Sequence, residues 1–307
     1  MKIYDVAVVG EIYVDHVFTG FTKWPQPGEE VFTHEYVQEI GGGAAITACA
    51  LGHLQRTITI VGVAGKNEMP WIVRRLSGCG VDCTGLHSTD SGTGVTVSVS
   101  TSIDRLFFTY TGANTRLEEY LVGDAVLQQL SAARHVHFAF PITAALATRL
   151  LEALHNAGCT ISLDVGYQVR WLSDAVNLDT CSRVDYLLPN EREANLIGGG
   201  DAHDYLGFTA LHHWPSGVVK MGAQGALMRG KRGVLHVPAL NAEVVDTTGA
   251  GDAFNAGFID GLLDREPGEE CLRRGCLCGG LSTRTAGALN GLPARDELNQ
   301  YYEELYG

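Results

Sequence analysis

The motif at residues 246–252 combines residue types that suit the handling of a phosphate group. It reads Asp-Thr-Thr-Gly-Ala-Gly-Asp, and the apolar run that follows predicts a helix. The backbone N–H groups of Gly249, Ala250 and Gly251 would lie unpaired at the positive end of the helix dipole, so we expect an anion site there. A carboxylate beside that site repels a bound phosphate, which indicates that Asp252 has a task, namely taking a proton from an attacking hydroxyl. The alternative is that Asp252 only caps its helix.

Strand-like apolar runs and helical patterns alternate along most of the chain. The runs that read as buried strands are 5–10, 57–65, 135–140, 160–165, 186–190 and 217–222. The segments with helical periodicity are 44–54, 68–78, 118–130 and 143–158. This alternation predicts an α/β fold in which helices cover both faces of a central, mainly parallel sheet.

Two segments depart from this alternation and are typical of β-hairpins. Residues 17–40 and 94–114 contain stretches in which polar and apolar side chains alternate, and the second segment turns at Ser102-Ile103-Asp104. We expect these segments to form a small β-sheet lid that stands off the main sheet, built from about residues 11–40 and 92–114.

The composition limits the range of possible functions. The 307 residues can bury a large core, and without an internal repeat or linker we expect one domain over 1–307. The formal net charge of −13, from 35 acidic residues against 22 Lys and Arg, argues against nucleic acid and membrane surfaces as partners. The first residues match neither a signal peptide nor a membrane span, so we expect a cytoplasmic protein. Its eight cysteines include no C-x-x-C pair and are typical of buried reduced thiols.

Five motifs, in sequence order, resemble those of the PfkB, or ribokinase-like, family of carbohydrate and nucleoside kinases. DTTGAGDAF (246–254) resembles the C-terminal signature of the family. The other four are EIGGGAAITACALGHL (39–54), TYTGAN (109–114), LLPNEREANLIG (187–198) and VVKMGAQGAL (218–227). The resemblance covers the whole chain and implies a three-layer α/β/α fold with a β-sheet lid, ATP as the donor and Mg²⁺ as cofactor. The chain has no G-x-x-x-x-G-K-[ST] motif, so it is not a P-loop enzyme.

The same resemblance implies roles for residues around the phosphoryl donor. Asp252 becomes the general base, and the amides of Gly249, Ala250 and Gly251 become the anion hole. Asn190 and Glu193 would place Mg²⁺ on the phosphates through water; the alternative is an Asn turn followed by a solvated Glu. The residues implied to border the nucleotide are Lys220, Gly222, Ala223, Gly225 and Cys276, the last standing where relatives commonly carry Asn. Some family members bind a monovalent cation, and the matching residues for K⁺ are Asp246, Thr248, Ser282, Thr285, Gly287 and Gly291.

The acceptor side departs from the family pattern. Ile46 and Phe140 stand where many relatives carry polar substrate contacts, and the Asp-Pro-Asn pattern seen in relatives that bind acidic sugars is Asp-Val-Gly at 164–166. The pocket should therefore be more apolar on one side than a ribose pocket, which widens the expected acceptors to sugar derivatives, inositols and nucleosides. The residues implied to bind the acceptor are Asp15, Gly41, Gly42, Gly43 and Arg170.

Three functional hypotheses follow from these motifs. The first is an ATP-dependent kinase that phosphorylates a hydroxymethyl group of a sugar. The second is a nucleoside kinase of the same fold, which could stack its substrate on Tyr13, Phe18, Trp24 or Phe107. The third is a catalytically silent sugar-binding or regulatory relative, against which the intact 246–252 motif argues. Resemblance to dimeric members also predicts a homodimer through the lid, because a small β-layer alone would leave an apolar face in water.

Overall fold

A nine-stranded sheet forms the centre of the protein. The computed structural model describes every residue except 1, 102–104, 167, 215 and 231–232, so the expected Ser102-Ile103-Asp104 turn lies outside the described residues. The strand order is β13-β12-β11-β10-β9-β8-β1-β4-β5. In this order, every neighbouring pair between β11 and β5 is parallel, whereas β12 pairs antiparallel with β11 and β13 pairs antiparallel with β12 at one edge. The bounds are β1 (Tyr4–Gly10), β4 (Ile58–Gly65), β5 (Val81–Thr89), β8 (Ala133–Ala139), β9 (Thr160–Leu163), β10 (Tyr186–Leu187), β11 (Ser216–Lys220), β12 (Ala226–Gly230) and β13 (Gly233–Val237).

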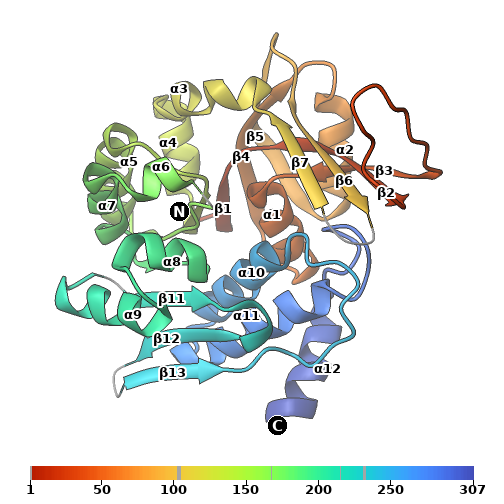
Figure 1. Ribbon diagram of the computed structural model, residues 1–307. Helices are drawn as coiled ribbons and strands as arrows, with labels where there is room; N and C mark the ends of the chain where they lie inside the picture. Colours follow the sequence, from red (N-terminus) through yellow and green to blue (C-terminus); the bar gives the residue numbers. More distant parts are fainter. Residues whose placement is uncertain (1, 102–104, 167, 215, 231–232) are drawn as a thin grey trace.

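Helices cover both faces of this sheet, which confirms the predicted three-layer α/β/α fold (Figure 1). One face carries α3 (Leu117–Leu121), α4 (Asp124–Ser131), α5 (Ala144–Asn156), α6 (Val169–Leu172), α7 (Ala175–Ser182), α8 (Glu191–Gly198) and α9 (Ala202–Leu211). The other carries α1 (Gly43–His53), α2 (Met69–Gly78), α10 (Ala250–Leu263) and α11 (Gly268–Ser282), with α12 (Arg295–Tyr306) packed outside α11. Within the described residues, no helix is both long enough and apolar enough to cross a membrane.

Strand β1 shows why the central strands read as continuous apolar runs. Val6 and Val8 belong to the core cluster on one face of the sheet, and Ala7 and Val9 belong to the cluster on the opposite face. All four side chains are fully buried. A strand covered on both sides loses the polar alternation of a half-exposed strand, so its apolar run marks the middle of the sheet.

The structure differs from the predicted elements in several places, and two of these differences have a clear local cause. The helix expected over 118–130 is two helices, α3 and α4, because Gly123 adopts an extended conformation directly before α4. Strand β5 is absent from the prediction because only two of its nine residues are buried, as expected for an edge strand that mixes polar and apolar residues.

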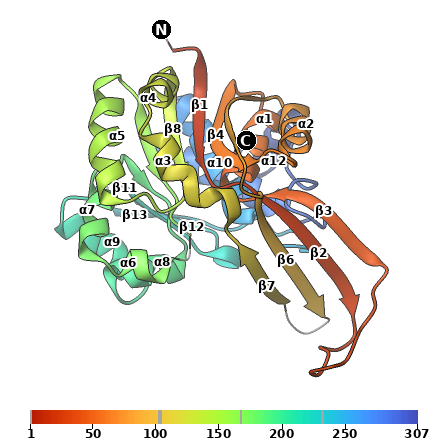
Figure 2. The same ribbon diagram turned by 90° about the horizontal axis from the view of Figure 1, so that it is seen from above.

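A second sheet of four strands stands apart from the central one. It consists of β2 (Tyr13–Phe21), β3 (Glu35–Gly41), β6 (Gly94–Thr101) and β7 (Arg105–Tyr110), in the order β3-β2-β6-β7. The pairs β2–β3 and β6–β7 are antiparallel, and β2 pairs with β6 in parallel. Figure 2 shows these strands projecting away from the layered body. The predicted small sheet is therefore confirmed, and we call it the small sheet below.

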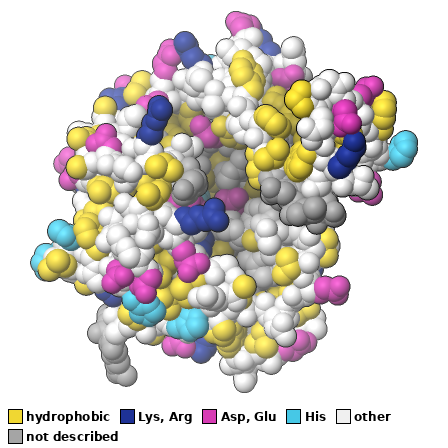
Figure 3. Space-filling model, viewed as in Figure 1, with side chains coloured by type: hydrophobic (Ala, Val, Ile, Leu, Met, Phe, Trp, Pro, Cys, Tyr) yellow, Lys and Arg dark blue, Asp and Glu magenta, His cyan; other side chains and the backbone are white. Residues whose placement is uncertain are grey.

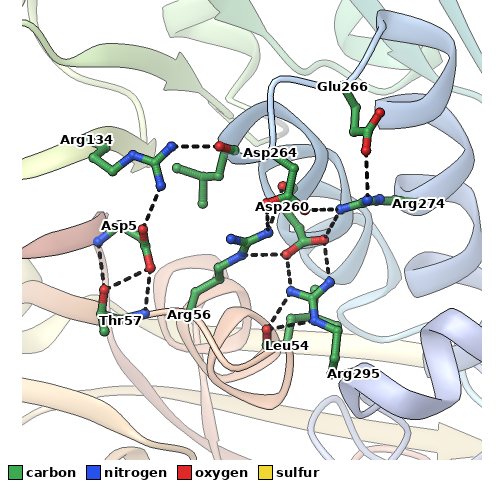
Figure 4. A network of polar contacts seen from close by, with 11 residues as sticks. Asp5, Leu54, Arg56, Thr57, Arg134, Asp260, Asp264, Glu266, Arg274 and Arg295 are labelled. Carbon is green, nitrogen blue, oxygen red and sulfur yellow. Dashed lines mark hydrogen bonds and ion pairs between the residues drawn. The ribbon is translucent and has the colours of Figure 1, made fainter.

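A buried carboxylate fixes α10, the helix that follows the 246–252 motif. The Asp260 side chain is fully buried and meets three arginines from different parts of the chain (Figure 4). Arg56 Nε lies 2.6 Å from Asp260 Oδ1, Arg274 Nη1 lies 2.7 Å from Oδ2, and Arg295 Nη1 lies 2.8 Å from Oδ2. Burial alone would raise the pKa of Asp260, but the arginines lower it. The network ties α10 to the segment after α1 and to α11 and α12.

Candidate active site

The start of α10 has the geometry of an anion site. Gly249 precedes the helix in the left-handed conformation, with φ of 75°, which glycine adopts without strain. The N–H of Ala250 donates to Thr247 O over 3.2 Å, so this amide is already engaged within the turn. Gly251 is exposed, and its N–H belongs to the first helical turn, where no intrahelical acceptor exists. Of the three amides expected in the anion hole, that of Gly251 is thus the best placed for a ligand.

Asp252 lies in the first turn of α10 with a perturbed carboxyl group. Burial, together with the negative charges of Asp164 and Glu193, raises its pKa to about 7, and the ammonium of Lys220 opposes this shift. A Cβ built on Gly43 would lie 2.8 Å from Asp252 Oδ1, so the first residue of α1 must be small for the carboxyl to keep this position. A carboxyl with a pKa near neutrality is suited to general base catalysis.

A network of three polar side chains stands beside Asp252. Lys220, the last residue of β11, places its Nζ 2.6 Å from Asp164 Oδ2 and 3.3 Å from Asn255 Oδ1. Asn255 Nδ2 also donates to Asp164 Oδ2 over 2.6 Å. Burial alone would lower the pKa of Lys220, but Asp164 and Glu193 raise it, so the ammonium stays protonated.

The Lys220 ammonium also reaches the anion site, because its Nζ is 3.5 Å from where a Cβ on Gly251 would stand. The sequence motifs assigned neither Asp164 nor Asn255 to the site. The available signal for Asn255 was its position three residues after Asp252, which places both side chains on neighbouring parts of one helix face.

The glycine run connects two carboxyl groups. Asp15 on β2 lies over Gly41, where an added Cβ would collide with its carboxylate. Gly42 precedes α1 with φ of 93°, and Gly43 faces Asp252 as described above. Burial and the charge of Glu39 together raise the pKa of Asp15 to about 6, against the opposing effect of a hydrogen bond from Thr96. The run therefore forms a floor without side chains between Asp15 and Asp252.

Asn190 and Glu193 form a capping box at the start of α8. Glu193 accepts hydrogen bonds from the Asn190 backbone N–H, over 2.8 Å, and from Asn190 Nδ2, over 2.7 Å. The Glu193 side chain is buried, in contrast to the solvated Glu of the alternative interpretation. Burial and the charge of Asp164 raise the pKa of Glu193 to about 7, so it shares the electrostatic cluster of Asp252 and Lys220.

The residues expected to border the nucleotide lie in two settings. Gly222, Ala223 and Gly225 belong to the tight turn between β11 and β12, where a Cβ on Gly225 would collide with the Val237 carbonyl. Cys276 is buried in an apolar cluster of α10, α11 and the β11–β13 strands, and its thiol lies 3.6 Å from Val237 O. The Cys276 side chain, which was predicted to border the nucleotide, thus lies beneath the protein surface.

The six residues expected at a K⁺ site come from the loop before α10, from the end of α11 and from the loop that follows α11. Asp246 Oδ1 accepts hydrogen bonds from Thr248 N and Oγ1 over 3.0 and 2.7 Å, and Asp246 Oδ2 accepts one from Gly287 N over 3.0 Å. A Cβ on Gly291 would collide with Ser282 O and would lie 2.9 Å from Thr285 Oγ1. These loops adjoin the anion site, since Gly249 packs against Ala288.

A hollow lies between the two sides of the molecule. Figure 3 shows it near the centre of the view, between α6 and α8 on one side and the small sheet on the other, with charged side chains of both signs around it. Arg170 is exposed on the short helix α6, which packs against α8.

A helix start, a lysine and a carboxyl with a raised pKa suit transfer of a phosphoryl group to a hydroxyl. The fold and this site define a phosphotransferase of the α/β class.

Comparison with known proteins identifies the family. The model of the pfkB family carbohydrate kinases matches residues 4–295, so this chain belongs to that family. It is an ATP-dependent carbohydrate kinase. It is similar to an ATP-dependent ribose-1-phosphate kinase of Halopiger xanaduensis, with 30% identity over 92% of this chain and 93% of the relative. It is also similar to a ribokinase of Haemophilus influenzae, with 26% identity over 97% of this chain and 98% of the relative. The Arabidopsis thaliana ribokinase structure with ribose and ATP superimposes with a TM-score of 0.86 at 25% identity, covering 97% of this chain and 98% of that one.

Proposed function

We propose that the protein transfers the γ-phosphoryl group of ATP to a hydroxymethyl oxygen of a sugar or sugar derivative, with Asp252 as the general base. The observation that carries this proposal is the position of Asp252, which stands in the first turn of α10 with a pKa raised to about 7. At neutral pH a large share of such a carboxyl is ionised and can take the hydroxyl proton as the oxygen attacks.

The residues around Asp252 supply charge stabilisation and orientation. Lys220 and the Gly251 amide face the region where negative charge would develop on the transferred group, and the Gly249 and Ala250 backbone shapes the turn that holds it. Asp164 and Asn255 hold the Lys220 ammonium in place by direct contacts. When bound as its Mg²⁺ complex, ATP supplies the phosphoryl group to be transferred. The Gly222–Gly225 turn is proposed to border the nucleotide, with Cys276 packed behind it.

Asn190 and Glu193 are the residues proposed to place Mg²⁺, through water. Their oxygen atoms suit a hard cation, and the pKa of Glu193 is raised by burial and by the negative charge of Asp164, which a cation would offset. For K⁺ we propose the loop that holds Asp246 together with the end of α11 at Ser282 and the loop after it, whose carboxylate, hydroxyl and carbonyl oxygens suit a weakly hydrated cation. Activity in KCl should exceed activity in choline chloride at equal ionic strength if this site is filled.

The acceptor is proposed to lie on the glycine floor between Asp15 and Asp252. The Asp15 carboxylate can accept two hydroxyl donors, which suits a polyol. The Ile46 and Phe140 side chains are almost fully buried and add apolar surface, so derivatives less polar than ribose are included. Arg170, exposed on α6, would favour an acceptor that carries an acidic group.

We also propose that the small sheet acts as a lid and as the interface of a homodimer. Phe107 and Phe108 are successive strand residues and therefore point to opposite faces of the sheet, yet 58% and 62% of their surfaces are exposed. One face can cover a bound substrate, and the other can pack against a second copy. The net charge of −13 disfavours nucleic acid and anionic membranes as partners, and a cytoplasmic location would give access to ATP.

An acceptor panel tests the proposal. The purified chain is incubated with Mg·ATP and with ribose, deoxyribose, an acidic sugar, an inositol or inosine, and ADP formation is measured beside the thermal shift that each compound causes. We expect ADP formation with at least one sugar, and none from the same compound with Asp252→Asn. Turnover with inosine alone would establish the nucleoside kinase instead. The absence of Asp252-dependent turnover across the panel would overturn the proposal.

A further inference from the structure

A cluster of sulfur, imidazole and guanidinium groups lies where the C-terminal ends of α1 and α2 meet. Cys49, Gly52 and His53 share one face of α1, because residues three and four apart on a helix are neighbours. Cys79 directly follows α2 and packs against this face. A Cβ on Gly52 would collide with the Cys79 carbonyl oxygen and would lie 3.8 Å from Cys79 Cβ, so the glycine allows the close approach of Cys79.

The thiol of Cys79 interacts with two groups on that face of α1. One is the thiol of Cys49, and the other is the imidazole of His53, whose Nδ1 lies 3.3 Å from Leu292 O. The Arg75 guanidinium on α2 adds positive charge and is itself held by Glu39 of β3, with Arg75 Nε 2.9 Å from Glu39 Oε1.

These neighbours give the two thiols opposite character. The hydrogen bond from Cys49 lowers the pKa of Cys79, and His53 and Arg75 lower it further, which outweighs the opposing effect of burial. The hydrogen bond with Cys79 and burial both raise the pKa of Cys49. Of the two thiols, Cys79 is therefore the one that ionises first, and Cys49 keeps its proton. The thiolate is the reactive form of cysteine, and cationic neighbours are typical of reactive cysteines.

The two thiols also differ in access to solvent. Cys79 is partly exposed, whereas Cys49 is fully buried. A small oxidant dissolved in water would therefore meet Cys79 first, with Cys49 placed behind it as the second sulfur. This arrangement is typical of an oxidant-sensing cysteine next to a resolving cysteine.

We propose that Cys79 and Cys49 form an oxidisable thiol pair that a hydroperoxide converts to a reversible disulfide between α1 and α2. In the first step the Cys79 thiolate attacks one oxygen of hydrogen peroxide; an S–O bond forms, the O–O bond breaks, and the departing hydroxide takes a proton from solvent to become water. In the second step the Cys49 sulfur attacks the sulfur of the Cys79 sulfenic acid; the S–S bond forms, the S–O bond breaks, and water leaves with the Cys49 proton. The pair loses two electrons, which reduce the peroxide to two waters.

Cys83 provides a matched control within the same chain. It is partly exposed like Cys79, but its thiol contacts neutral groups, namely Ser77 Oγ at 3.8 Å and Val81 O at 3.5 Å, and the nearby charge that acts on it is the negative one of Asp82. Burial raises the pKa of Cys83. The two cysteines therefore differ mainly in charge environment, so a difference in their reactivity reports the cluster around Cys79.

The test uses the reduced full-length chain and hydrogen peroxide, followed by alkylation, proteolysis and mass spectrometry. We expect a peptide linked through Cys49 and Cys79 that dithiothreitol removes, while Cys83 stays alkylated. In a separate experiment the iodoacetamide reaction of Cys79 should change less than about twofold between pH 6 and pH 8, whereas that of Cys83 should rise roughly tenfold per pH unit. In Cys49→Ser, dimedone should trap sulfenic acid at Cys79. Absence of the linked peptide from the unmodified chain, or a Cys79 rate that rises with pH as steeply as that of Cys83, would overturn the proposal.

Discussion

At the scale of single residues, Asp252 makes the first prediction. Asp252→Asn keeps the size of the side chain but removes the group that accepts the proton, so kcat should fall by at least roughly 10²-fold. The affinity for ATP, measured by calorimetry, should stay near that of the unmodified protein because the anion site belongs to the backbone. A variant that keeps nearly full turnover would remove Asp252 from the role of base.

The pH dependence of the reaction gives a second prediction from the same residue. The pKa of Asp252 is raised to about 7, and the base must be ionised to act, so kcat/KM should reach a plateau at higher pH and fall about tenfold per unit below pH 7. Asp164 raises this pKa and Lys220 lowers it. Asp164→Asn should therefore move the acidic limb to lower pH and Lys220→Gln to higher pH, each by roughly one unit.

The two variants serve as controls for each other, because both disturb the same ion pair while changing the charge in opposite directions. A general loss of structure would lower the rate in both variants without moving the limbs apart. If the acidic limbs of the two pH profiles move in the same direction, or do not move in either variant, these charges do not set the pKa of the base.

At the scale of elements, the capping box of α8 makes the third prediction. Glu193→Gln removes the negative charge behind Asn190, so the Mg²⁺ concentration for half-maximal rate should rise by roughly tenfold. The matched control is Asp204→Asn, which alters the exposed capping box at the start of α9, where Asp204 Oδ2 accepts from Asp201 N over 2.9 Å. Loss of a cap should slightly lower stability in both variants. An equal Mg²⁺ titration in all three proteins would leave Glu193 with a capping role alone.

The arginine network of α10 makes the fourth prediction. Asp260→Asn leaves Arg56, Arg274 and Arg295 without their buried counter-charge, so the free energy of unfolding in urea should fall by roughly 3–5 kcal/mol. Asp264→Asn, at the end of the same helix, is the control; Asp264 is partly exposed and its loss should cost about 1 kcal/mol or less. Because the pKa of Asp260 is lowered by folding, its contribution is present above the unfolded pKa near 3.8 and is lost as the pH falls through the folded value.

The sequence could predict those parts of the site that depend on local spacing. The turn at Gly249 and the position of Asp252 follow from seven consecutive residues, and the Asn190-x-x-Glu193 spacing correctly marks a helix start. Partners that come from distant strands leave no local signal. Lys220 meets an aspartate from the end of another strand, 56 residues earlier, and only the strand order brings the two together.

The local sequence pattern also could not predict which side chains are buried or where helices begin and end. Nothing in the spacing distinguishes a solvated Glu193 from the buried one, because burial depends on how α8 sits against the sheet. Likewise the apolar pattern of 118–130 fits one helix. The extended backbone at Gly123 divides this segment, so that α3 and α4 each pack their own apolar residues on the sheet.

At the scale of the whole molecule, the small sheet and the segment between β2 and β3 bring together several exposed aromatic side chains. Phe32, Phe107, Phe108 and Tyr110 each expose more than half of their surface, although the central sheet is covered on both faces. Burying such aromatic side chains is favourable by roughly 25 cal/mol per Å² of apolar area, so a closed lid and a second copy of the chain are both natural partners for the sheet.

The fifth prediction concerns these partners. We expect light scattering at micromolar concentration to give the mass of a dimer. Phe108→Ser and Phe107→Ser alter opposite faces of β7, so one variant should dissociate the dimer while the other should weaken acceptor binding, seen as a higher KM with the dimer intact. Hydrogen exchange in β2, β6 and β7 should slow when acceptor and Mg·ATP are added, because closure over Asp15 excludes water that would otherwise receive the phosphoryl group. A monomer whose small sheet exchanges equally fast with and without ligands would contradict both the dimer and the lid.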